Sequence, residues 1–196
     1  MAALRARQRM TVSMLARSVG VSPSLISQIE RGHSRPSVST LVALANALGV
    51  SVDALFRDRD AGGRAGDHES ERVSDAYVVR RGERAAIDID GGVRWEQLTP
   101  VPLRGVEFKE LVYSAHGESN PSLYRHPGME MVLVLEGELD IFVGLELCRL
   151  GEGDSICFPS TTPHRYVNPT RMTTRAVTVT LAEADGHGLP TAPQED

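Results

Sequence analysis

Cysteine is scarce in this sequence: among 196 residues only Cys148 and Cys157 occur, and they do not form a CxxC pair. A disulfide-rich scaffold and a CxxC redox or zinc motif are therefore excluded. Both cysteines lie in strand-like segments, so we expect free thiols packed as small hydrophobic residues. A redox switch is the alternative interpretation.

Long hydrophobic runs are also missing. No segment approaches the roughly 20 apolar residues that a transmembrane helix needs. The N-terminal stretch MAALRARQRM is basic, but no continuous apolar run follows it, so it does not have the form of a secretory signal. We expect a soluble, cytoplasmic protein that has no membrane partner.

The charge of the chain is unevenly distributed, which favours two domains. Residues 1–56 hold six arginines against Glu30 and Asp53, a balance of +4, whereas the remainder holds 15 basic and 24 acidic residues, a balance of −9. A basic segment on an acidic body favours phosphate binding at one end. The predicted division is a domain at 1–56, a flexible linker at 57–75, a second domain at 76–183 and a disordered tail at 184–196.

The first domain contains a pattern typical of a helix-turn-helix. Gly20 separates two short amphipathic segments and suits a tight turn between packed helices. Thr11 can cap the first segment and Ser22 the second, where Pro23 would occupy the first helical position at no cost in hydrogen bonds. The apolar positions that define the two segments are Leu15, Val19, Val21, Ile26 and Ile29.

The second helix of this pair carries a polar outward face. Ser24, Ser27, Gln28 and Arg31 follow helical spacing on the side opposite the isoleucines. In a DNA major groove, Gln28 could pair with adenine, Ser24 could contact a base edge and Arg31 would lie toward the phosphates. An ordinary solvated helix face is the alternative.

The segments LARSVGVSPSLISQIERG and SRPSVSTLVALANALGVSVDALF resemble the lambda-repressor-like (Xre-type) helix-turn-helix family over residues 4–56. The resemblance implies double-stranded DNA as a partner, with base contacts from Ser24 and Gln28. It implies phosphate contacts from Ser22, Ser27, Arg31 and Arg35.

The same resemblance implies a structural ion pair between Arg5 and Glu30. Two positions depart from the family: Arg9 stands where glycine usually ends the first helix, and Pro23 stands where a side-chain donor often reads a base. We expect five helices in this domain: one over Met1–Arg9, the two above, a fourth between Ser37 and Gly49, and a fifth that begins at Ser51 and carries Leu55 and Phe56.

From Tyr77 onward the pattern changes to short β-prone runs separated by Gly, Pro, Asn and Asp, as in an all-β barrel or sandwich. Trp95 and Tyr113 lie in such runs, and we expect both to pack in the core. The predicted strands are YVVRR, AAIDI, VRWEQL, VEFKELVYSA, EMVLVLEG, ELDIFVG, SICFP, HRYV and RAVTVTL.

Three residues of the β half are candidate metal ligands. His126 and Glu130 stand four positions apart at the start of one predicted strand, and His164 precedes another. Two imidazoles and a carboxylate suit Fe(II), Mn, Ni or Zn and leave coordination positions open. From spacing alone, separate surface polar groups are the alternative.

The segments around these residues, His126-Pro-Gly-Met-Glu130 and Gly153-Asp-Ser-Ile-Cys-Phe-Pro159, resemble the two cupin motifs. The resemblance implies a jelly-roll (double-stranded β-helix) barrel and assigns ligand roles to His126, Glu130 and His164. Tyr124 stands where the first motif usually has another histidine, so a three-ligand metal site and a metal-free organic ligand are both open. The Tyr124 phenol would enter the effector pocket or pack in the barrel core.

The fold class predicted for the whole chain is therefore α+β multidomain, with an all-α helix-turn-helix domain and an all-β cupin barrel. This combination resembles bacterial Xre regulators with a cupin sensor, which implies a homodimeric transcription factor that binds a palindromic operator and a small-molecule effector. The alternative is a cupin-type iron oxidoreductase that carries a helix-turn-helix domain, like hydroxypropylphosphonate epoxidase. A metal-free barrel that serves only dimerisation is the third interpretation.

Overall fold

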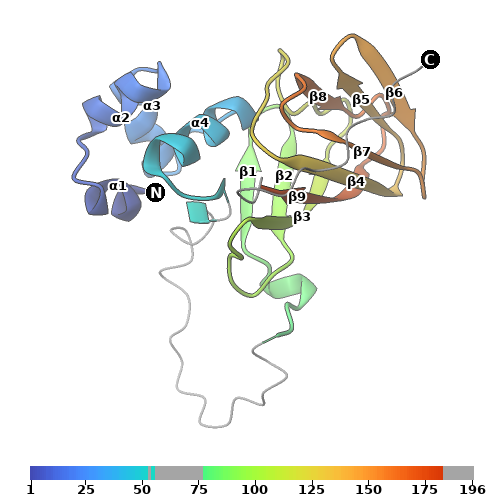
Figure 1. Cartoon of the computed structure of the whole chain (residues 1–196), viewed down its shortest axis with the longest axis horizontal. Coiled ribbons are helices and arrows are strands. Elements are labelled where there is room, and N and C mark those ends of the chain that lie inside the picture. Colours follow the sequence, from blue (N-terminus) through green and yellow to red (C-terminus); the bar gives the residue numbers. More distant parts are fainter. Residues whose placement is uncertain (53, 56–76, 183–196) are drawn as a thin grey trace.

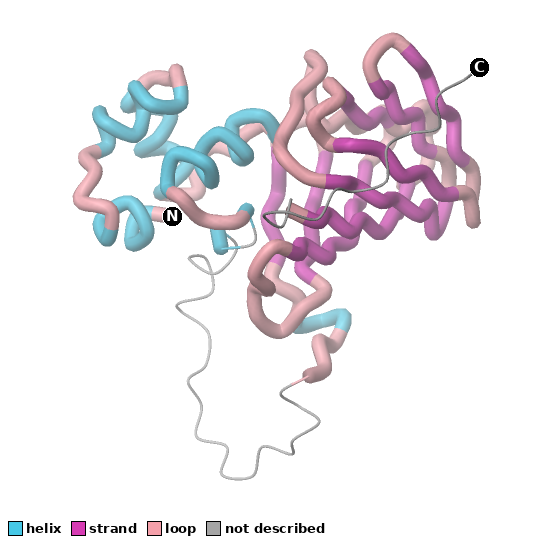
Figure 2. The backbone as a smooth tube through the Cα atoms, in the orientation of Figure 1, coloured by secondary structure: helices cyan, strands magenta, loops and turns pink. Residues whose placement is uncertain are grey.

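The structure is a computed structural model that describes residues 1–52, 54–55 and 77–182. A helical domain (residues 1–55, the head) lies beside a β domain (residues 77–182, the barrel), as Figure 1 and Figure 2 show. The predicted linker at 57–75 and tail at 184–196 lie outside the described residues. In the part of the chain described, no helix has both the length and the apolar character needed to cross a bilayer.

Among its described residues the head has four α-helices, and three of them begin at a side-chain cap. The side chains of Thr11, Ser22 and Ser37 each accept the backbone hydrogen bond that caps a helix start. Gly20 and Gly49 end helices in the left-handed conformation, at φ of 75° and 63°. The helices are α1 (Ala2–Arg7), α2 (Val12–Val19), α3 (Pro23–Glu30) and α4 (Val38–Leu48).

The first helix is shorter than predicted, and its end involves Arg9. Arg9 has a φ of 54°, the left-handed conformation that glycine supplies in the related family. The amide of Arg9 donates to the Ala6 carbonyl at 2.9 Å and the amide of Met10 to the Arg5 carbonyl at 3.1 Å. These are the bonds of a Schellman motif. Helix α1 therefore ends in a Schellman motif in which arginine occupies the position that usually requires glycine.

The described residues do not show the predicted fifth helix in full. Val52, Ala54 and Leu55 instead have 3-10 geometry, and the Ala54 amide donates to the Ser51 carbonyl at 3.1 Å. Phe56 lies outside the described residues.

Nine strands build the barrel from two sheets. The larger sheet has the order β1-β2-β3-β9-β4-β7 and the smaller has the order β6-β5-β8. Alternating burial along β9 shows that even-numbered residues face the interior. The strands are β1 (Ala86–Ile89), β2 (Val93–Gln97), β3 (Val106–Tyr113), β4 (Met129–Glu136), β5 (Leu139–Val143), β6 (Glu146–Leu150), β7 (Ser155–Pro159), β8 (His164–Val167) and β9 (Thr174–Leu181).

Two strand predictions need correction. The run YVVRR at 77–81 is not a strand: Tyr77 is 75% exposed, and residues 81–83 form a 3-10 turn. The larger sheet ends at β1, so this run has no strand to pair with. Strand β6, by contrast, was not among the predicted runs.

The cysteines lie in strands as predicted, but they are not packed in the core. Cys148 lies in β6 and is half-buried, and Cys157 lies in β7 and is exposed. Neither thiol is in a disulfide. β6 and β7 are the end strands of their sheets, which leaves these side chains nearer solvent than the core positions.

The head packs directly against the barrel. The Asp90 amide donates to the Pro36 carbonyl at 3.0 Å, and the Ser39 hydroxyl donates to Asn120 Oδ1 at 2.9 Å. In Figure 1, α4 is the helix that lies next to the β1 end of the larger sheet. Buried apolar residues of the two parts form one continuous cluster. The two domains therefore share a packed interface.

Candidate nucleic-acid interface and metal centre

The predicted reading face of α3 points to solvent. Ser22, Ser24, Gln28 and Arg31 are exposed, and Ser27 is half-buried. The Gln28 amide nitrogen donates to the Ser24 hydroxyl at 3.4 Å, a contact that aligns the two predicted base-reading side chains. On the opposite face, Ile26 and Ile29 are buried. The helix thus presents small polar groups and one guanidinium outward.

An ion pair between α1 and the end of α3 holds this face in place. Arg5 Nε and Nη2 donate to the two carboxylate oxygens of Glu30 at 2.8 and 3.0 Å, while Arg5 Nη1 donates to the Met10 carbonyl at 2.9 Å. Hydrogen bonding to Glu30 raises the pKa of Arg5 despite its partial burial. The ion pair expected from the family resemblance is confirmed. All three guanidinium nitrogens of Arg5 donate hydrogen bonds within the head.

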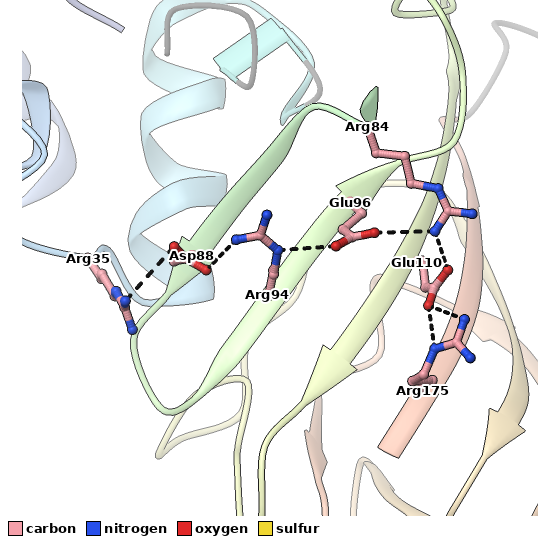
Figure 3. Close-up of polar contacts among 7 residues, drawn as sticks. All are labelled: Arg35, Arg84, Asp88, Arg94, Glu96, Glu110 and Arg175. Atoms are coloured by element: carbon pink, nitrogen blue, oxygen red, sulfur yellow. Dashed lines mark hydrogen bonds and ion pairs between the residues drawn. The ribbon is translucent and has the colours of Figure 1, made fainter. Parts of the chain in front are cut away.

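Arg35 lies at the edge of the head that faces the barrel. Its Nη2 is 3.9 Å from an Asp88 carboxylate oxygen, and its side chain is 62% exposed. Figure 3 shows Arg35 at one end of a row of charged residues that runs on over the sheet. The Arg35 side chain is therefore mostly solvent-exposed and makes one long ion-pair contact with the barrel.

The three predicted metal ligands converge inside the barrel. Their ligand atoms lie within 4.8 Å of one another. Glu130 Oε2 is 3.3 Å from His126 Nε2 and 3.4 Å from His164 Nε2. Strand β4 supplies Glu130, the start of β8 supplies His164, and the loop before β4 supplies His126. The alternative, that the three residues are separate polar groups on the surface, is therefore wrong.

Hydrogen bonding orients both imidazoles toward the carboxylate. His164 Nδ1 lies 2.8 Å from the Thr162 carbonyl, and His126 Nδ1 lies 3.2 Å from the Pro127 carbonyl. A carbonyl only accepts, so each Nδ1 carries a hydrogen and each Nε2 faces Glu130, where it offers a lone pair whenever the ring is neutral. Glu130 Oε2 and His164 Nε2 are buried and have no hydrogen-bond partner among the described residues. Such a set of facing lone pairs fits a bound cation.

The electrostatics of Glu130 and His164 agree with this fit, whereas burial of His126 is outweighed by hydrogen bonding to Glu130 and the pKa of His126 is raised. Burial alone would raise the pKa of Glu130, but the two histidines outweigh it and the pKa is lowered. Burial lowers the pKa of His164, only partly opposed by Glu130. The carboxylate is thus ionised and the buried His164 is neutral near pH 7, the protonation states in which both bind a metal.

Tyr124 closes one side of the ligand set. Its ring is 9% exposed and lies edge-on to His164, with centroids 4.5 Å apart. Its amide and carbonyl pair with those of His164 across an isolated bridge. Tyr124 is buried in the barrel and also lines the cavity, so both predicted places for it stay open, and Arg125 is exposed. The tyrosine thus shapes the site.

A cavity of about 300 Å³ opens beside His126 and Glu130. The barrel contributes Trp95 and Tyr113, which sequence reasoning placed only in the core, together with Glu107 and Lys109, which it missed. The sequence did contain a signal for Lys109. This residue stands two positions before Leu111 and four before Tyr113, so in a strand it shares one face with these large, mainly apolar residues. The head contributes the other wall, which includes Val42, Ala45, Asn46, Val50, Ser51 and Val52.

Comparison with known families assigns both domains. Residues 1–55 match the helix-turn-helix family, and residues 110–180 match the cupin domain family. The chain therefore has an N-terminal helix-turn-helix domain of the Xre type and a C-terminal cupin domain.

Relatives of this helix-turn-helix cupin protein include the HTH-type transcriptional regulator SutR of Escherichia coli, 26% identical over 84% of this chain and 83% of SutR. An uncharacterized transcriptional regulator of Rhodospirillum rubrum is 43% identical over 30% of this chain and 58% of its own length. The crystal structure of a helix-turn-helix family regulator from Vibrio cholerae has a TM-score of 0.62 at 22% identity and covers 93% of both chains. This last likeness shows the shared fold.

Proposed function

We propose that this protein is a DNA-binding transcriptional regulator whose cupin barrel senses a small molecule beside a bound divalent metal. The observation that carries the proposal is the exposed polar face of α3 on a head packed against a barrel with a convergent ligand set. Regulators similar to this chain over most of their length support it.

The head would bind double-stranded DNA through α3 in the major groove. Ser24 and Gln28 would contact base edges, with Gln28 suited to bidentate hydrogen bonds to adenine. Ser22, Ser27, Arg31 and Arg35 would contact phosphates and set the register of the helix. A homodimer would place two such helices about 34 Å apart, which suits the half-sites of a palindrome.

His126, Glu130 and His164 would hold the metal, and Tyr124 would form part of the effector pocket. Zn, Fe, Ni and Mn all accept two imidazoles and a carboxylate. A divalent ion held there supplies a Lewis acid with open positions for an effector. The protein residues orient the ligand atoms and screen them from bulk water.

Effector binding would reach the head because α4 and residues 50–52 form one wall of the cavity. A ligand there touches both domains, so it alters the contacts that set the position of α3. A coupling free energy on the order of 1–3 kcal/mol is typical of such systems.

Metal analysis and selection of DNA from random sequence, done on one preparation, test the proposal. A regulator predicts an enriched palindrome and a metal content near one ion for each chain. Failure to enrich any sequence at low salt would contradict the regulator.

A metal-dependent oxidoreductase is the second candidate function, favoured by the ligand set itself. Two histidines and one carboxylate with open positions are the arrangement of Fe(II) oxygenases. Iron in the purified protein without any enriched DNA sequence would favour this enzyme. Oxygen consumption in the presence of small organic substrates would then be the measurement.

A further inference from the structure

The cavity wall contains hydrogen-bond donors that lack acceptors. Trp95 Nε1 and the Tyr113 hydroxyl are buried, line the cavity and have no partner among the described residues. Burial raises the pKa of Tyr113, so its phenol keeps the proton. A buried donor left unpaired costs about 1–3 kcal/mol. An acceptor oxygen in the cavity would remove that cost.

A cation stands beside these donors. Lys109 is 4% exposed, lines the cavity and places its Nζ 4.6 Å from the centre of the Trp95 ring. Of the 21 Lys and Arg residues in the sequence, Lys109 alone is lysine. Lysine offers a compact charge on a flexible stem, which can follow a ligand, whereas arginine favours fixed planar pairs.

The charges that line the cavity favour an anion once a metal is present. A divalent ion and Lys109 bring three positive charges, and Glu107 and Glu130 bring two negative ones, which leaves one positive charge. No other Lys, Arg, Asp or Glu among the described residues lines this cavity. A monoanion would make the site neutral.

The strand register places Lys109 within reach of the metal ligands. Lys109 pairs with Thr178, and Glu130 pairs with Thr180 two residues along the same strand β9, which lies between β3 and β4. Two strand spacings and the offset of two residues along β9 together place the two backbone positions roughly 12 Å apart. The cavity of about 300 Å³ holds roughly ten non-hydrogen atoms at the volume of liquid water. One small molecule can therefore touch both ends.

We propose that this cavity binds a small carboxylate with a short apolar body, recognised by Lys109, Trp95 and Tyr113 and completed by the metal. The inference rests on the proposed function, because it names the chemical class of the effector. Trp95, Tyr113 and Lys109 supply donors to the oxygens of the ligand, and the apolar body lies against Val42 and Ala45 of α4.

The same carboxylate would compete with Glu107 for Lys109, and Glu107 is the residue that binds the Val52 amide of the head. Glu107 forms an ion pair with Lys109 through Oε2, and its Oε1 accepts the Val52 amide at 3.1 Å. An anion that takes Lys109 leaves Glu107 without its cation, and the carboxylate can then shift against Val52. The ligand therefore acts on the head through Glu107 as well as through α4.

Trp95, the single tryptophan, reports on the cavity directly. The zinc-loaded full-length protein is titrated with 2-hydroxy-4-methylpentanoate, its neutral amide and 4-methylpentylamine, while Trp95 fluorescence is followed. The carboxylate should give a saturable change that the amide and the amine do not. Lys109→Met should weaken binding at least about tenfold, and Tyr113→Phe about threefold to fivefold. Arg125→Met, which removes an exposed charge outside the cavity, should leave the dissociation constant unchanged.

Equal binding by wild type and Lys109→Met would overturn the inference, and so would preferential binding of the amine. Should Lys109→Met fail to fold, judged by its thermal midpoint, Lys109→Arg replaces it, with an expected loss of affinity of at least about threefold. DNA selection distinguishes a failure of the proposed regulator function from a failure of the proposed effector class. An enriched palindrome without carboxylate binding rejects only the effector class, whereas carboxylate binding without an enriched sequence rejects the regulator and keeps the site.

Discussion

At the residue scale, Arg9 determines how the first helix of the head ends. Arg9 has a left-handed conformation, which costs an L-residue roughly 1–2 kcal/mol relative to the right-handed one. Glycine avoids this cost but loses more entropy on folding. The balance between these effects is open to measurement, because Arg9 is exposed and donates no side-chain hydrogen bond among the described contacts.

We expect Arg9→Gly to raise the free energy of unfolding by up to about 1 kcal/mol, because it relieves the left-handed strain. Urea denaturation measures the change. Ala6→Gly, in the exposed middle of α1, is the control and should lower stability by about 0.5–1 kcal/mol. A destabilised Arg9→Gly protein would show that the arginine side chain contributes packing.

Gln28→Ala should weaken binding to the selected DNA site by about 1–3 kcal/mol while random DNA is bound almost as before. The reason is that an amide paired with adenine reads sequence, whereas phosphate contacts do not. Fluorescence anisotropy on both DNAs measures the difference. Equal losses on the two would remove Gln28 from the base-reading set.

His164→Ala should lower metal affinity at least about tenfold, because one of the three convergent ligands is gone and a buried imidazole cannot be replaced by water at the same position. Metal content after dialysis measures this, with His33→Ala, an exposed histidine of the head, as the control. DNA binding without effector should persist. If the variant does not fold, the imidazole is primarily structural.

At the scale of elements, a charged network on the outer face of the larger sheet joins four strands. Figure 3 follows it from Asp88 through Arg94, Glu96 and Arg84 to Glu110. Glu110 is 3% exposed and accepts from both Arg84 and Arg175, at 2.5 and 2.7 Å. Burial alone would raise the pKa of Glu110, but these two arginines outweigh it and the pKa is lowered.

Glu110→Gln should lower the free energy of unfolding at pH 7 by about 2 kcal/mol, because two guanidinium groups lose their shared carboxylate. The folded pKa lies below the ordinary value, so the contribution is complete above about pH 4.5 and is lost as pH falls through the folded pKa. Denaturation of both proteins between pH 7 and 3 should therefore show that the difference in their free energies of unfolding becomes smaller as the pH falls. Glu136→Gln, at the exposed end of the same network, should change stability far less. A gap that stays constant with pH would contradict the pairing.

At the scale of the whole molecule, the head and the barrel hold each other through Arg35 and Asp88, Ser39 and Asn120, and Val52 and Glu107. Arg35 is also a proposed phosphate contact. If Arg35 contacts a phosphate, Asp88 competes with DNA for this arginine.

Asp88→Asn should raise DNA affinity about twofold to fivefold and steepen its dependence on salt, because Arg35 is released and one repulsive charge is gone. Asp90→Asn removes the same charge from the exposed turn after β1 and is the matched control. Binding curves at several salt concentrations measure both. Equal gains in the two variants would assign the effect to net charge rather than to Arg35.

Much of this protein was open to prediction because the information is local. Thr11, Ser22 and Ser37 cap helices through bonds that span three residues, so their roles follow from sequence. The convergence of His126, Glu130 and His164 was also predicted, but spacing alone did not decide it. The family resemblance carried that prediction, since His164 is 34 residues away from Glu130 in the sequence.

The sequence by itself determined the two kinds of domain, the helix caps and the polar outward side of α3, because periodicity, capping and motif spacing are properties of short segments. Only the tertiary structure decided that α4 covers the cavity and that Lys109, Trp95 and Tyr113 share its wall. Those positions depend on strand register and on packing between residues far apart in the chain, which no local pattern records.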